Sequence, residues 1–154
     1  MKLVRSNDLP FVSTIEKSRF SGTRKGLTPP EAKLSAGMWE LPPGKRSFPM
    51  HAHHVTEEAM YVISGNAKIR TPDGETAIGP GDYVSFTAGG PAHQLVNDGK
   101  EKLVYLAFGV NVAGVDIVEY PDSGKIACSI GTGPDRKRFM FRAKDTVDYF
   151  EGEE

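Results

Sequence analysis

Short apolar runs that end in turn residues recur along most of this chain, and this pattern constrains its fold more than any other feature. Clusters such as Pro-Pro-Gly at 42–44, Ser-Gly-Asn at 64–66 and Asn-Asp-Gly at 97–99 follow successive runs. Such spacing is typical of β-strands joined by tight turns. No window keeps a 3.6-residue period over the length of a helix, which argues against long helices. The predicted strands cover residues 36–41, 59–63, 67–70, 76–78, 82–86, 93–96, 103–110, 115–120 and 137–141.

The composition favours a single all-β domain. A length of 154 residues is within the usual size of one domain and is sufficient to bury an apolar core. The 17 glycines and 11 prolines are spread along the chain, as many turns require. Closed barrels and two-sheet jelly rolls are the architectures that protect this many short strands from exposed edges. We therefore expect a β-barrel or a jelly roll.

Three segments can be distinguished along the chain. Residues 1–35 are mixed and polar, and we expect an N-terminal arm with one strand around Phe20. Residues 36–120 are expected to form the barrel, and residues 121–154 a C-terminal extension that packs on it. Both end segments carry apolar residues, which must be buried to offset the conformational entropy lost on ordering. Burial against a second copy predicts a homodimer, whereas folding of both ends over their own barrel is the alternative.

Charge and hydropathy exclude several classes of partner. The formal net charge is −1 and the basic residues are scattered, so the chain lacks the positive surface that nucleic-acid binding needs. No apolar stretch is long enough for a signal peptide or a membrane span. Cys128 is the only cysteine, which excludes an internal disulfide. We expect a cytoplasmic protein with neither nucleic acid nor membrane as a partner.

Histidines and acids gather just before the predicted strand at 59–63. Side chains on an extended segment alternate between its two faces, so His51 and His53 share one face while His54 points to the other. Glu58 opens the next strand and can approach this pair, whereas Glu57 has the opposite parity and is expected in solvent or beside a cation. Taken alone, the segment could equally be a solvated surface loop.

His93 begins a later predicted strand and can complete the set with His51, His53 and Glu58. Three imidazoles and one carboxylate suit a transition metal, and an octahedral ion would keep two positions open. The pattern predicts one divalent ion of Fe, Mn, Ni, Zn or Cu held by these four side chains. His54 is expected on the outer face or beside a ligand.

The spacing of these residues resembles that of the cupins. Their first motif, G-x5-H-x-H-x(3,4)-E-x6-G, is similar to the segment from Gly44 to Gly65, with six residues instead of five before His51. Their second motif, G-x5-P-x-G-x2-H-x3-N, is similar to the segment from Gly81 to Asn97, with Thr87 in place of proline and one extra residue before the histidine. Both departures fall in turns, where insertions are tolerated. The resemblance implies a small single-domain bacterial cupin, a double-stranded β-helix with the four ligands inside its barrel.

Three functions remain open, because one barrel can host many reactions. The first is a metal-dependent dioxygenase or other oxygenase that acts on a small anionic, chelating substrate. The second is a sugar-phosphate isomerase or epimerase, in which the metal polarises a hydroxy-carbonyl group and a side chain moves a proton. The third is a non-catalytic barrel that binds or senses a small ligand. Candidates for a base or an anion contact in the second are Glu57, His54, Lys45 and Arg46.

Other residues have a structural interpretation first. Asn97 is expected to cap a turn. Five large side chains are expected in the core, with the lining of a substrate pocket as the alternative: Trp39, Phe48, Met60, Phe86 and Tyr105.

Overall fold

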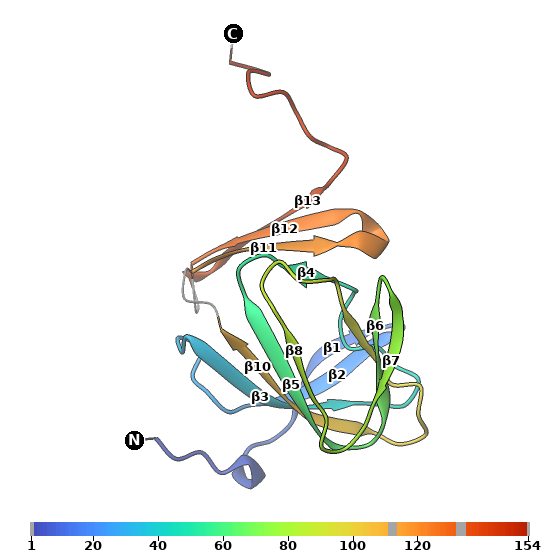
Figure 1. The fold of residues 1–154 in the computed structure, drawn as a ribbon. Helices are drawn as coiled ribbons and strands as arrows, with labels where there is room; N and C mark the ends of the chain where they lie inside the picture. Colours follow the sequence, from blue (N-terminus) through green and yellow to red (C-terminus); the bar gives the residue numbers. More distant parts are fainter. Residues whose placement is uncertain (1, 111–113, 132–134, 154) are drawn as a thin grey trace.

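The structure is a computed structural model that describes residues 2–110, 114–131 and 135–153 (Figure 1). Within these residues the chain is built from β-strands, with two short 3-10 turns, η1 (Ser6–Asp8) and η2 (Pro121–Ser123). No helix in the described ranges is long and apolar enough to span a bilayer. The strands are β1 (Val12–Lys17), β2 (Phe20–Gly26), β3 (Leu34–Leu41), β4 (Ala52–His53), β5 (Glu57–Ser64), β6 (Ala67–Thr71), β7 (Gly74–Ile78), β8 (Tyr83–Phe86), β9 (Gln94–Val96), β10 (Leu103–Val110), β11 (Val115–Tyr120), β12 (Lys125–Ile130) and β13 (Lys137–Arg142).

Among the described residues, these strands form three sheets. The largest has the order β1-β2-β3-β10-β5-β8, the second β13-β12-β11-β4 and the third β7-β6-β9. Every pair of these strands in the described residues is antiparallel, and several pairs join strands distant in sequence, such as β3 with β10. This arrangement confirms the predicted all-β class and double-stranded β-helix, because its strands cross between sheets to close a barrel.

The barrel interior is filled by alternate residues of the central strands. Val62 of β5 and Leu103 of β10 have no exposed surface, and Leu41 of β3 has almost none. Because side chains alternate along a strand, the inward positions of these strands meet in one core. Its buried members are Leu41, Met60, Val62, Ala67, Ile69, Ile78, Leu95, Leu103 and Tyr105.

Both end segments add strands to these sheets. In the predicted arm, β1 and β2 form a hairpin, and β2 pairs with β3 at the edge of the largest sheet. In the predicted extension, β12 pairs with β11, and β13 pairs with β12. Figure 1 shows the second sheet lying over one end of the barrel and the tail after β13 projecting away from it. The division at residues 35 and 120 stays a prediction.

Gly65, between β5 and β6, shows why a glycine ends the first motif. Its φ is +81°, a left-handed conformation that side chains disfavour. A Cβ atom at this position would lie 2.5 Å from the carbonyl oxygen of Lys102 and 2.9 Å from the Cα of Leu103. The chain therefore passes so close to the start of β10 that only glycine fits here.

Candidate metal centre

The backbone places His51 and His93 side by side. The N–H of His51 donates to the carbonyl of His93 at 3.1 Å, and the N–H of His93 donates back at 2.8 Å. This antiparallel bridge joins the segment before β4 to the start of β9. Directly opposite residues in an antiparallel pair project their side chains to the same face. The two imidazole rings accordingly lie with their centroids 4.8 Å apart.

Glu58 reaches the histidines from the opposite wall of the barrel. It lies on β5, directly across from Phe86 on β8 and from Gly109 on β10. The ring of Phe86 stacks on His93 with a centroid separation of 3.6 Å and an interplanar angle of 9°. The strand pair that carries Glu58 therefore also fixes the orientation of the His93 ring.

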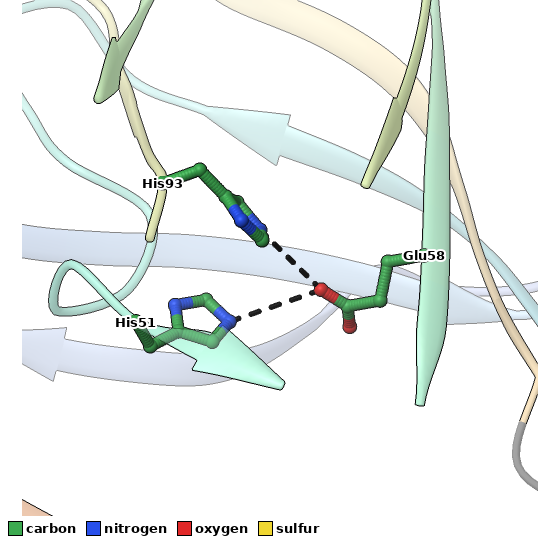
Figure 2. Close-up of side chains that lie close together, drawn as sticks. All are labelled: His51, Glu58 and His93. Carbon is green, nitrogen blue, oxygen red and sulfur yellow. Dashed lines mark ion pairs between the residues drawn. The ribbon is translucent and has the colours of Figure 1, made fainter. Parts of the chain in front are cut away.

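Three imidazole nitrogens converge on one carboxylate oxygen. The Oε2 atom of Glu58 lies 3.5 Å from Nε2 of His93 and 3.8 Å from Nε2 of His51, the two contacts drawn in Figure 2. The Nε2 atom of His53 lies 3.7 Å from the same oxygen. One ligand atom from each of His51, Glu58 and His93 lies within 4.8 Å of the other two. These distances leave room for an ion between the side chains.

The surroundings keep Glu58 ionised. Burial acts to raise the pKa of Glu58, but the imidazoles of His51, His93 and His53 outweigh it and hold that pKa well below the usual range of a glutamate. The carboxylate is therefore available to a cation.

The Nδ1 atoms of His51 and His53 have hydrogen-bond acceptors that orient both rings. The Nδ1–H of His51 donates to the carbonyl oxygen of Pro49 at 2.9 Å. The Nδ1–H of His53 donates to Oδ2 of Asp116 at 2.5 Å. In both rings Nδ1 is thereby engaged and Nε2 is the nitrogen that faces Glu58, which is the orientation that metal-ligating histidines use. Nδ1 of His93 is buried and has no hydrogen-bond partner among the described residues.

Asp116 on β11 is a residue that the sequence analysis did not select. Its side chain is 2% exposed, and it accepts hydrogen bonds from His53, from the backbone N–H groups of Val55 and Thr56, and from the Thr56 hydroxyl. Burial acts to raise the pKa of Asp116, but these donors, His53 foremost, lower it overall. The sequence did contain a pattern that could have identified Asp116. It alternates with Val118 and Tyr120 on the buried face of the strand, and a buried carboxylate requires hydrogen-bond or charged partners.

The donor set of this cluster fits a divalent transition metal. Three imidazole nitrogens and one ionised carboxylate are the ligands that such ions prefer, whereas magnesium and calcium prefer oxygen ligands alone. Contraction of the present separations to metal–ligand distances of about 2.0–2.2 Å needs only small side-chain movements. The cluster of His51, Glu58 and His93, with His53 beside it, can therefore hold a metal.

A cavity of about 640 Å³ opens in front of the cluster. Trp39, Phe48, Met60, Phe86 and Tyr105 all line it, so the alternative of a pocket wall agrees with the structure for all five. Met60 and Tyr105 are also buried in the core and Trp39 and Phe86 pack against it, but Phe48 is exposed, so the core expectation was wrong for Phe48. Tyr105 is 4% exposed, and burial together with the negative charge of Glu58 raises its pKa. Tyr105 thus presents a neutral phenol inside the barrel.

The remaining candidate residues lie outside this cavity. His54 is exposed, and its Nε2 lies 3.0 Å from Glu119 on the outer face. Glu57 is exposed as well. The ammonium group of Lys45 donates to the carbonyl of Ser18, and Arg46 donates to the side-chain oxygen of Gln94. None of these four residues is in the described cavity lining.

Asn97, the last residue of the second motif, holds a turn together. Its side chain is buried, donates to the carbonyls of Leu41 and Glu101 at 2.8 and 2.9 Å, and accepts from the N–H of Gly99 at 3.0 Å. The expected capping role of Asn97 agrees with these contacts.

Comparison with known proteins places the chain in a family. Residues 37–109 match the model of the cupin domain. A solved structure from Acidithiobacillus ferrooxidans, provisionally named a sugar phosphate isomerase, is 30% identical, covers 83% of this chain and 80% of that chain, and has a TM-score of 0.73. The chain belongs to the cupin superfamily. No curated protein matches this cupin in sequence.

Two further solved structures support the same fold. A sugar phosphate isomerase of the cupin superfamily from Silicibacter pomeroyi is 19% identical, covers 97% of this chain and 98% of that chain, and has a TM-score of 0.78. A predicted oxalate decarboxylase from Thermotoga maritima is 22% identical, covers 72% of this chain and all of that chain, and has a TM-score of 0.63. At these identities the likeness concerns the fold alone.

Proposed function

We propose that this cupin is a metal-dependent enzyme acting on a small anionic substrate inside the barrel. One divalent transition metal ion would be held by His51, His53, Glu58 and His93. The observation that carries the proposal is the convergence of three Nε2 atoms, at 3.5–3.8 Å, on one oxygen of Glu58 at the wall of the cavity. Three neutral imidazoles and one carboxylate leave a divalent centre with net positive charge, which favours an anionic ligand.

The chain's own residues orient and enclose the substrate. The metal, when bound, would supply a Lewis-acidic and, for Fe or Mn, a redox-active centre. Asp116 fixes the orientation of the His53 ring from the side away from the metal. Trp39 and Phe86 give the pocket an apolar wall, and the neutral phenol of Tyr105 can donate a hydrogen bond to a substrate oxygen.

We place an oxygenase-type reaction first, because it requires the fewest catalytic groups in addition to the metal ligands and the pocket. Proton-transfer chemistry needs a positioned base that is free to act. Within the described lining of the cavity, Glu58 is the only carboxylate, and it is one of the proposed ligands. The bases expected from the sequence, Glu57 and His54, lie outside the cavity. A reaction between a substrate and O2 at the metal does not depend on such a base.

A sugar-phosphate isomerase is the second candidate. It is supported by the name of the 30% identical protein from Acidithiobacillus ferrooxidans. Tyr105 and Tyr120 line the cavity and are the groups that would have to move a proton in this case. A non-catalytic barrel that binds a small ligand through the metal is the remaining alternative.

Assays in the presence and absence of oxygen separate these functions. The protein is loaded with Fe(II) or Mn(II) and offered catechols, small keto acids and phosphorylated sugars. Oxygen uptake that is lost in Glu58→Gln and retained in the neighbouring control Glu57→Gln supports the oxygenase. Conversion of a sugar phosphate under anaerobic conditions supports the isomerase instead. Stoichiometric metal with no turnover in either assay would leave the ligand-binding alternative and contradict an enzyme.

We also propose that the protein is a homodimer. Support comes from the outer face of the second sheet, where Ile117, Phe139 and Phe141 are 44%, 47% and 55% exposed, and from the tail, where Tyr149 and Phe150 are 87% and 68% exposed. Exposed apolar side chains gathered on a sheet face are typical of an interface, and an apolar tail can add to it. Light scattering coupled to size-exclusion chromatography should give twice the chain mass. A single monomeric mass at micromolar concentration would contradict the dimer.

A further inference from the structure

Three basic side chains lie on the face of the second sheet that lines the cavity. Lys125 opens β12, Arg138 lies on β13 and Arg136 directly precedes β13. All three line the same cavity as the histidine and glutamate cluster. Arg136 also lines a second cavity of about 240 Å³, to which His53 and Glu58 contribute. We refer to Lys125, Arg136 and Arg138 as the basic row.

The strand register connects the basic row to the candidate metal centre. Asp116 of β11 is opposite Ser129 of β12, and Ser129 is opposite Arg138 of β13, so these three side chains share one face of the sheet. Two strand spacings of roughly 4.8 Å place the Arg138 backbone about 10 Å from Asp116. Since Asp116 holds His53, the basic row is at the distance of a small substrate molecule from the metal ligands.

The basic row has polar neighbours but no acidic partner. Arg136 donates to the Ser129 hydroxyl at 2.9 Å, and Arg138 donates to the hydroxyl of Tyr120. The ammonium group of Lys125 lies 5.7 Å from the centre of the Tyr120 ring. Within the part of the chain that the structure describes, no carboxylate forms an ion pair with any of the three.

Three other basic residues in the described part of the chain are paired with carboxylates. Lys68 lies 2.8 Å from Asp98, Arg70 lies 2.6 Å from Asp122, and Lys102 lies 2.5 Å from Glu40. A fourth cation at the cavity, Arg24, donates to the carbonyl of Ala36 and lies over the Trp39 ring. Like charges on neighbouring positions repel each other unless an anion lies between them. The basic row therefore has the character of an anion-binding site.

From this geometry we infer that the basic row binds a phosphoryl group of the substrate while the other end of the same molecule reaches the metal. The inference rests on the proposed function. Two guanidinium groups and one ammonium group carry more positive charge than a single carboxylate can balance. A phosphate dianion suits them better, because it carries two negative charges and its oxygens accept several charge-assisted hydrogen bonds. Tyr120 adds a donor, because its hydroxyl accepts from Arg138 and keeps its own proton for the ligand.

The test uses inorganic phosphate as the probe and isothermal titration calorimetry as the measurement. The wild-type protein is compared with Arg138→Gln, with Arg138→Lys and with Arg136→Gln. The control is Lys137→Gln, which removes a positive charge from the same strand. Lys137 alternates with Arg136 and Arg138 and so projects from the opposite face of the sheet. Each titration is run on the metal-loaded protein and repeated after removal of the metal, because phosphate can also bind a metal directly.

Each glutamine variant of the basic row should weaken phosphate binding by about tenfold, the loss expected for one charge-assisted contact. Arg138→Lys should weaken it less, and Lys137→Gln should leave it nearly unchanged. Phosphate should also bind more tightly than malonate. Equal losses in Lys137→Gln and Arg138→Gln, tighter binding of malonate, or no phosphate binding by the wild-type protein would each overturn the inference.

Elemental analysis of the same samples separates this inference from the proposed function. Arg136→Gln and Arg138→Gln should retain the wild-type metal content. Absence of metal from every sample, with phosphate binding still dependent on the two arginines, would contradict the metal enzyme while leaving a phosphate site. Normal metal content with phosphate binding indifferent to the arginines would contradict the phosphate site alone.

Discussion

The ring of His53 is held by Asp116 through a 2.5 Å hydrogen bond between Nδ1 and Oδ2, although the two residues are 63 positions apart in the sequence. The contact forms because β4 pairs with β11, with His53 directly opposite Val118. Asp116 in turn accepts three further hydrogen bonds from Val55 and Thr56. The second sheet thereby fixes both the tautomer and the direction of one proposed ligand.

Asp116→Asn should weaken metal binding without removing it. The amide keeps the shape of the side chain but introduces an N–H group where four donors now meet a carboxylate. We expect the metal affinity to fall by roughly 10–100-fold and the free energy of unfolding to fall by about 2 kcal/mol. Competition with a chelator and urea titration measure the two effects. Asp122→Asn, which removes only the ion pair with Arg70, is the matched control, and an equal loss of metal affinity there would contradict the assigned role of Asp116.

Asn97→Ala should reduce stability and leave the metal site intact. The substitution removes three hydrogen bonds and leaves the buried carbonyl of Leu41 without its side-chain donor. The free energy of unfolding should fall by about 3 kcal/mol, as measured by denaturant titration. Asn7→Ala in the exposed turn η1 serves as the control. A variant of wild-type stability, or one that folds but loses its metal, would show that Asn97 does more than cap a turn.

Gly65→Ala should destabilise the barrel more than Gly44→Ala. Both glycines have a positive φ, +81° and +71°, so both alanines carry the left-handed penalty. Only at Gly65 would the new Cβ also clash with the backbone of Lys102 and Leu103, whereas nothing lies within 4 Å at Gly44. We expect losses of about 2–5 kcal/mol at Gly65 and about 1–2 kcal/mol at Gly44 in thermal unfolding. Equal losses would show that the close approach is relieved at no cost.

Much of the barrel could be predicted from local patterns. The predicted strand at 103–110 coincides with β10, and that at 115–120 coincides with β11, because long apolar or strictly alternating runs identify strands reliably. Strand β12 was missed because Lys125, Cys128 and Ser129 interrupt its apolar residues. Strand β1 was missed because the segment around Val12 and Glu16 lies at a sheet edge and is mostly exposed, so its sequence has little apolar alternation.

Some residues of the candidate site could likewise be predicted from local patterns, and others could not. Alternation along four residues was sufficient to separate His53, which faces Glu58, from His54, which faces Glu119 outside. Asp116 and the basic row could not be placed, because their approach to the cavity depends on the pairing of β11, β12 and β13 over the barrel end. Strands β11 to β13 are neighbours in the sequence, but their sheet joins the barrel through the pairing of β11 with β4, whose opposed residues Val118 and His53 are far apart in the sequence. No local pattern encodes that contact.

The metal content of the purified protein tests the central claim most directly. The account predicts one divalent transition metal ion per chain by elemental analysis, lost in His51→Ala and Glu58→Gln and retained in their neighbouring controls His54→Ala and Glu57→Gln. The controls alter the same residue types on the opposite face of the same segments. A wild-type protein that binds no transition metal when loaded, or a Glu58→Gln variant that binds it as tightly as Glu57→Gln, would contradict the account.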